Sequence, residues 1–135
     1  MKKSTTAVVL VVCLVALFAV TAAPASANLG KSPGYWANHL NKWWTTTPGV
    51  TIGGVVYTNA EACTLMLTPP SGDKTFTMFN AVLAGLLNGT SAGQAYAAGQ
   101  QWLICHPLGS GVAASDPAWQ DSGEGIKDAL HATWE

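Results

Sequence analysis

The sequence predicts a mainly α-helical fold, a small bundle of five or six short helices with one β-hairpin and a single disulfide. Three observations lead to this prediction. Apolar residues recur at three- and four-residue spacing in several short segments, as on the buried face of a helix. Gly and Pro residues separate these segments. Two runs of β-branched residues flank Gly53–Gly54, which is the pattern of a hairpin.

The first half of the chain is expected to form two helices around the hairpin. Ser32–Pro33 pairs an N-cap residue with proline at the first helical position, and this helix is expected to run to about Trp44. The hairpin is expected over residues 50–57. Thr58 and Glu61 have the spacing of a capping box, which starts a helix that ends near Leu67, before two prolines.

The second half is expected to be helical with short loops. A single apolar stripe (Phe76, Phe79, Leu83, Leu86 and Leu87) predicts a longer helix that stops at Asn88–Gly89. Ser91 is expected to cap a helix that runs to Cys105. Asp116–Pro117 is expected to begin a helical turn around Trp119. The last helix is predicted after Gly125, with its own apolar stripe (Ile126, Ala129, Leu130, Thr133 and Trp134).

The first 27 residues have the pattern of a cleavable secretory signal peptide. Lys2 and Lys3 precede an apolar run over residues 7–20, fourteen residues against the roughly 20 that span a bilayer. The segment ends at Ala25–Ser26–Ala27, a cleavage site of the A-x-A type. We expect cleavage after Ala27 and export to the extracellular space or the cell envelope. A membrane anchor retained in the mature protein is the alternative.

Residues 28–135 form one predicted domain of 108 residues, a usual size for a single core. They hold four lysines, no arginine and seven acidic residues, for a net charge of 4 − 7 = −3. Nucleic acid is therefore not an expected partner, because its phosphates are bound by clustered Lys and Arg. No transmembrane anchor is expected after cleavage.

Cys63 and Cys105 are the two cysteines that remain once the leader with Cys13 is removed. In a small protein exported to an oxidising compartment, two cysteines are most simply one disulfide. The bridge would close a loop of about forty residues and stabilise the fold by about 4 kcal/mol in the chain-entropy model. A metal pair is the alternative, but the C-x-x-C spacing typical of such sites is absent.

The segment Ser32–His39 resembles the Gly-Tyr-Trp-x-Asn-His motif of a family of exported bacterial proteins of unassigned function. The similarity continues at residues 53–58 and 61–62, at 87–89, and at 109–112 followed by Trp119. Two features depart from the family pattern. Ala37 replaces the usual basic residue, and residues 132–135 replace a Tyr-Asn-Asn-Gly ending. The resemblance implies export and a single small domain, and it implies no reaction and no catalytic residues.

Tyr35, Trp36, Asn38 and His39 are the main candidates for a binding site. Tyr35 and His39 are four residues apart and share one helix face. A ligand could be held by aromatic stacking and by hydrogen bonds from Asn38 and His39. The alternative is structural: Trp36, Leu40 and Trp43 form a stripe that faces the core, while Asn38 and His39 bind neighbouring backbone groups.

The six tryptophans fall into two groups. Trp36, Trp102 and Trp134 lie on predicted apolar stripes and are expected in the core. Trp43, Trp44 and Trp119 are the candidates for exposure. Exposed aromatic rings on a weakly charged surface suit the faces of sugars or an apolar partner.

Metal and catalytic sites have weak support in the sequence, so we expect no metal and no cofactor. His39, His106 and His131 match no ligand spacing, and the acidic residues Asp116, Asp121 and Glu124 lack the order of a calcium loop. Gly109–Ser110–Gly111 is not the G-x-S-x-G elbow of a hydrolase.

The sequence therefore favours a non-catalytic binding or structural module, which engages glycan or another exported protein through the Gly-Tyr-Trp region. The alternative is a small extracytoplasmic hydrolase with a site centred on His39 or on paired carboxylates.

Overall fold

The computed structural model describes residues 30–44 and 49–134. The described part contains five α-helices and one antiparallel hairpin, in agreement with the predicted fold class. The predicted signal peptide lies outside the described residues. Among the helices that are described, none has the length and apolar character needed to cross a membrane.

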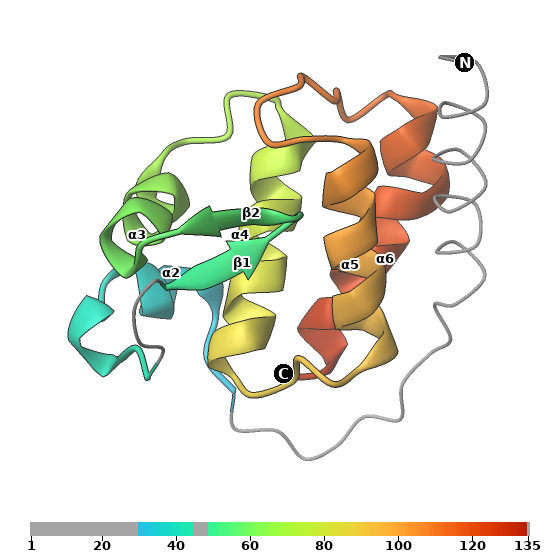
Figure 1. Cartoon of the computed structure of the whole chain (residues 1–135). Helices are drawn as coiled ribbons and strands as arrows, with labels where there is room; N and C mark the ends of the chain where they lie inside the picture. Colours follow the sequence, from blue (N-terminus) through green and yellow to red (C-terminus); the bar gives the residue numbers. More distant parts are fainter. Residues whose placement is uncertain (1–29, 45–48, 135) are drawn as a thin grey trace, which may run out of the picture.

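Three helices form the centre of the molecule: α4 (Lys74–Leu87), α5 (Gln94–Cys105) and α6 (Glu124–Ala132). They stand side by side and pack against one another (Figure 1). Almost every α4 residue from Met78 to Leu87 is buried, since this helix is covered on several sides. As predicted, Asn88 caps its C-terminus, and Gly89 follows with a φ of +79°.

The hairpin and the smaller helices cover the remaining side of α4. Strands β1 (Val50–Ile52) and β2 (Val55–Tyr57) pair antiparallel and cross in front of α4 (Figure 1). Gly53 and Gly54 form the turn with positive φ values of 59° and 79°, as the two-glycine signal predicts. Helix α3 (Asn59–Leu67) begins with the predicted capping box.

Three element boundaries differ from the sequence prediction. The first helix, α2 (Pro33–Ala37), ends well before Trp44, and a short 3₁₀ helix, η1 (Leu40–Lys42), follows it. Gly93, not Ser91, is the N-cap of α5. The turn begun by Asp116 widens into a π-helical turn, η2 (Trp119–Gly123), which continues directly into α6.

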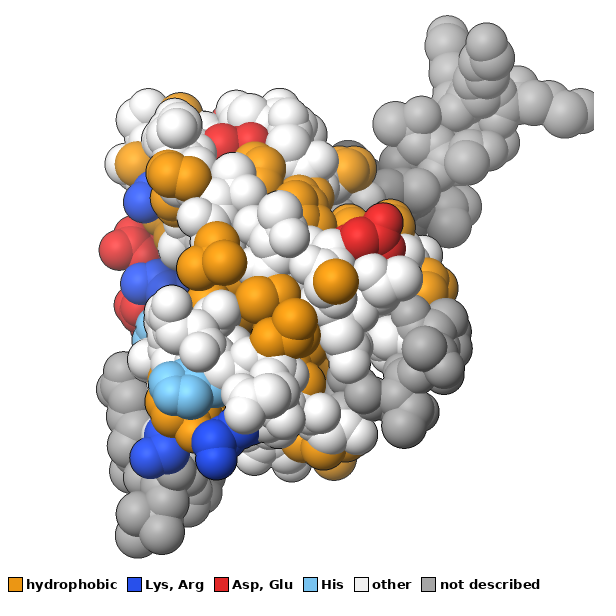
Figure 2. All heavy atoms as spheres, turned by 90° about the vertical axis from the view of Figure 1, so that its left-hand side faces the viewer, with side chains coloured by type: hydrophobic (Ala, Val, Ile, Leu, Met, Phe, Trp, Pro, Cys, Tyr) orange, Lys and Arg blue, Asp and Glu red, His pale blue; other side chains and the backbone are white. Residues whose placement is uncertain are grey.

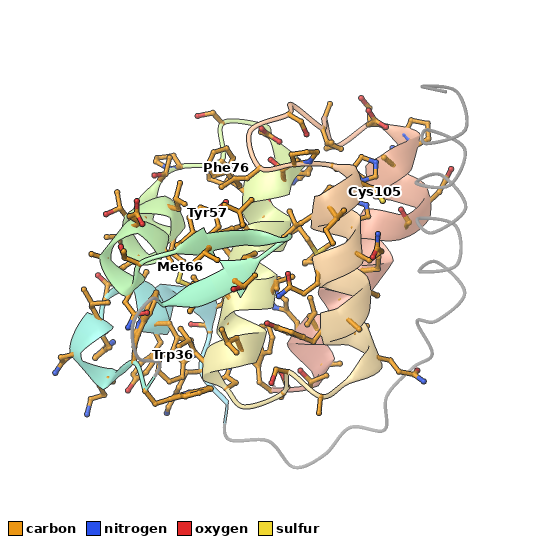
Figure 3. The ribbon with its side chains drawn as sticks, viewed as in Figure 1. Trp36, Tyr57, Met66, Phe76 and Cys105 are labelled. Carbon is orange, nitrogen blue, oxygen red and sulfur yellow. The ribbon has the colours of Figure 1, made fainter. Side chains whose placement is uncertain are left out.

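The predicted Cys63–Cys105 disulfide is wrong. Cys63 is a free, buried thiol on α3, and its Sγ donates to the backbone oxygen of Ala37 in α2 at 3.2 Å. Figure 3 shows Cys105 at the end of α5, on the opposite side of the molecule from α3. A disulfide needs Cβ atoms about 4 Å apart, and these two helices place the cysteines on different sides of the bundle.

Candidate functional site

The Gly-Tyr-Trp-x-Asn-His segment forms α2 and the turn that ends it. Ser32 caps the helix by accepting a hydrogen bond from the Tyr35 backbone N–H at 3.3 Å. Asn38 donates its side-chain amide to the Gly34 oxygen at 2.8 Å, and His39 Nδ1 lies 2.6 Å from the Tyr35 oxygen. The polar residues of the motif therefore bind their own backbone, which is the structural alternative stated above.

Asn88 fastens this segment to the end of α4. Its Oδ1 accepts from the Lys31 backbone N–H at 2.7 Å and from Trp36 Nε1 at 3.2 Å, while its amide donates to the Lys31 oxygen at 2.7 Å. Trp36 is buried beside it. Two parts of the family-like pattern, residues 32–39 and 87–89, thus meet in space. Apart from the predicted helix stop at Asn88, no local sequence pattern indicates this contact.

Tyr35 and His39 stack on the outside of the same corner. The ring centroids are 4.0 Å apart, and the two rings are nearly parallel, with an interplanar angle of 17°. The Lys31 ammonium lies 5.4 Å from the centre of the Tyr35 ring, at cation–π distance. The structure therefore brings together the predicted Tyr35 and His39, but one face of the tyrosine ring is already covered by the histidine.

The three tryptophans expected at the surface do not form a patch. Trp43 is 8% exposed and donates its indole N–H to the Trp36 oxygen at 2.9 Å. Trp119 is 4% exposed and packs edge-on against Trp102. The expected exposure of these two rings is therefore wrong, because η1 and η2 turn both toward the core. Burial of Trp43 agrees with the structural alternative, although Leu40 of the same predicted stripe is 41% exposed.

Trp44 is the exposed member of the group, with 58% of its surface accessible. Its indole N–H donates to the Leu87 backbone oxygen at 3.0 Å, so the ring is fixed at the end of α4. The expected core tryptophans, Trp36, Trp102 and Trp134, are all buried.

The glycine-rich loop at 109–112 is bound to the start of α4 by Asp73, a residue that the sequence analysis treated only as part of a turn. Asp73 accepts hydrogen bonds from the Gly111 and Val112 backbone N–H groups at 3.1 and 3.2 Å. Asp73 Oδ1 also accepts hydrogen bonds from the Thr75 backbone N–H at 3.0 Å and from the Thr75 hydroxyl at 2.7 Å. The loop is therefore a structural element, and nothing in it activates Ser110 as a nucleophile.

The pKa of Asp73 reflects these hydrogen bonds. Burial alone would raise it, but the bonds from Thr75, Gly111 and Val112 favour the carboxylate and lower the pKa below its ordinary 3.8.

Burial raises the pKa of the Cys63 thiol above 9.0, so this cysteine is held in its neutral form.

Gln100 of α5 binds the hairpin turn, a role that no sequence pattern predicted. Its Oε1 accepts from the Gly53 N–H at 2.5 Å, and its amide donates to the Thr51 oxygen and to the Tyr96 hydroxyl, both at 2.8 Å. The two-glycine turn is thus fixed by a side chain 47 residues further along the chain.

Two arrangements would support catalysis, a His39–carboxylate pair or a cluster of metal ligands. Among the described residues, no carboxylate is bound to His39, and no three His, Cys, Asp or Glu side chains gather as metal ligands would. A cavity of about 30 Å³ lies between the hairpin, α4 and the end of α5, away from His39. Its lining is apolar and includes Ile52, Tyr57, Phe79 and Leu103.

Comparison with protein-family models, with curated proteins and with solved structures found no match to this chain. The family resemblance therefore remains a prediction from the motifs.

Proposed function

We propose that the chain is a secreted or surface-associated, non-catalytic binding module that engages glycan or another exported protein. The observation that carries this proposal is the state of Trp44. A large aromatic ring is held in place by its indole N–H and still presents most of its surface to solvent. A ring fixed in this way loses little conformational entropy when a ligand stacks on it.

The polar residues of the motif support a binding role over a hydrolytic one. Asn38 and His39 hold the backbone of α2, so they serve to fix the segment that leads to Trp44. General acid–base catalysis would need a titratable pair around a substrate-sized cleft. The cavity beside the hairpin is lined mainly by apolar side chains, and its volume of about 30 Å³ is far below the roughly 300–1,000 Å³ of ligand pockets.

The proposal is tested with the exported protein recovered from an expressing bacterium, by a glycan-array and pull-down screen. We expect Trp44→Ala to weaken binding to the ligand found by about tenfold or more, as for a central aromatic contact. Leu67→Ala is the matched control, because Leu67 is 57% exposed on α3 and lies outside the Trp44 region. Equal binding by parent and Trp44→Ala would contradict the proposed surface, and a parent that binds neither glycan nor protein would contradict the function.

A further inference from the structure

Charge is unevenly distributed along the exported part of the chain. Residues 28–60 hold Lys31 and Lys42 and no acidic residue, for a charge of +2. Residues 61–135 hold the other two lysines and all seven acidic residues, for a charge of 2 − 7 = −5. The first third of this weakly charged domain is therefore positively charged, although the domain as a whole is negative.

The fold gathers this positive end around Trp44. The Trp44 indole binds Leu87, and the Lys31 backbone binds the next residue, Asn88, so both lie at the C-terminus of α4. Lys31 contacts Tyr35, which stacks on His39. Lys42 lies in η1, where its N–H donates to the His39 oxygen at 2.9 Å. We call the group of Lys31, Tyr35, His39, Lys42 and Trp44 the basic–aromatic corner.

The two lysines of the corner lack a carboxylate partner within the residues that the structure describes. The ion pair found there, Lys127–Asp128, belongs to α6. Figure 2 shows two lysine side chains beside a histidine at one end of the face that carries α3, with the acidic side chains of that face elsewhere. Unpaired cations on one small area create a local positive potential despite the net negative charge. Cleavage after Ala27 would add an α-ammonium group three residues before Lys31.

His39 adds a directed polar group to the corner. A backbone oxygen can only accept, so the Nδ1 atom that contacts the Tyr35 oxygen carries the proton. Nε2 of this tautomer is then a hydrogen-bond acceptor for a ligand.

We infer that the basic–aromatic corner binds an acidic polysaccharide, whose uronic-acid carboxylates would pair with Lys31 and Lys42 while a sugar ring stacks on Trp44. This inference rests on the proposed binding function and names its ligand class. A flat exposed aromatic ring suits the C–H face of a pyranose, and the lysines without carboxylate partners suit regularly spaced carboxylates. An acidic peptide would use the lysines but gain less from a fixed, flat ring.

The experiment is a calorimetric titration of the exported protein with tetragalacturonate and with its methyl ester, which carries the same sugar rings without charge. We expect the acidic form to bind about tenfold more tightly and to lose this advantage as salt is raised. The double variant Lys31→Gln/Lys42→Gln should bind both forms equally. Lys127→Gln, which removes one positive charge from α6, should keep the parent preference.

The other outcomes separate this inference from the proposed function. If tetragalacturonate and its methyl ester bind equally tightly, and both depend on Trp44, the inference of an acidic ligand is contradicted. The proposed glycan-binding function would still hold. Binding of polyglutamate as tightly as tetragalacturonate, with the same lysine dependence, would overturn the sugar class in favour of an acidic protein partner. Binding of neither oligosaccharide would overturn the inference, while the array and pull-down screen decides the broader function independently. Circular dichroism of each variant checks that the fold is retained.

Discussion

Asp73 shows how one carboxylate can join distant parts of a small protein. It caps α4 through Thr75 and holds the loop that contains Gly111 and Val112, 38 and 39 residues away. Thr75 is fully buried, and its hydroxyl accepts a further bond from the Gly109 N–H at 2.9 Å. Four donors therefore depend directly on the charged form of this side chain.

Replacement of Asp73 by Asn should destabilise the protein by about 1–2 kcal/mol at pH 7, because charge-assisted hydrogen bonds are lost and an amide faces a backbone donor. The folded-state pKa of Asp73 lies below its ordinary value of 3.8. Its stabilising contribution is therefore complete above about pH 5 and is lost as the pH falls through the folded-state value.

Urea denaturation at pH 7 and pH 3 checks this prediction. The difference in unfolding free energy between parent and Asp73→Asn should shrink at the lower pH. Asp121→Asn removes a charge from an exposed residue of η2 and serves as the control. A difference that stays constant between the two pH values would contradict the role given to the Asp73 carboxylate.

At the scale of elements, α4 organises the fold from both of its ends. Its N-terminus binds the glycine-rich loop through Asp73, and its C-terminus binds the α2 segment through Asn88. Along its length it contacts α5, α6 and the hairpin. Segments far apart in sequence thus meet at the two caps of one buried helix.

Close packing of the three central helices depends on Gly99 of α5. A Cβ atom there would lie 2.6 Å from Val82 Cγ2 of α4 and 3.0 Å from Leu130 Cδ1 of α6. We expect Gly99→Ala to cost about 1–3 kcal/mol through overpacking.

Gly125→Ala is the matched substitution, because a Cβ on Gly125 of α6 would have no neighbour within 4 Å. It should stabilise the protein by about 0.5–1 kcal/mol through helix propensity. Urea midpoints of the two variants, measured beside the parent, test the pair. A Gly99→Ala protein as stable as the parent would contradict the packing of α4, α5 and α6 described above.

At the scale of the whole molecule, export is a prediction from the leader, which lies outside the described residues. In a bacterial host we expect a processed protein that begins at Asn28, as measured by N-terminal sequencing and intact mass. Ala27→Leu should block processing, because the peptidase requires a small residue at this position. Ser26→Leu is the control, since the middle residue of the A-x-A site is not restricted in this way. Processing of Ala27→Leu at the same bond would contradict the assignment.

The sequence determined most of the secondary structure, because its signals are local. The capping box of α3, the Gly53–Gly54 turn and the Asn88–Gly89 stop each depend on residues within a few positions of one another. The apolar stripe that ends at Leu87 similarly needs only helical periodicity. Local signals overestimated the length of the first helix. The side chains of Asn38 and His39 bind the preceding turn, and the chain then continues as a 3₁₀ helix.

Tertiary structure alone decided which side chains face the core, the solvent or one another. Counting cysteines predicted a disulfide, but the packing of α3 on α2 buries Cys63 as a free thiol. Neighbouring Trp43 and Trp44 are chemically identical, and only the path of the chain after η1 buries the first and leaves the second exposed. The basic–aromatic corner likewise exists only because the end of α4 holds Lys31 and Trp44 together, through contacts between residues too far apart for a local pattern to reveal.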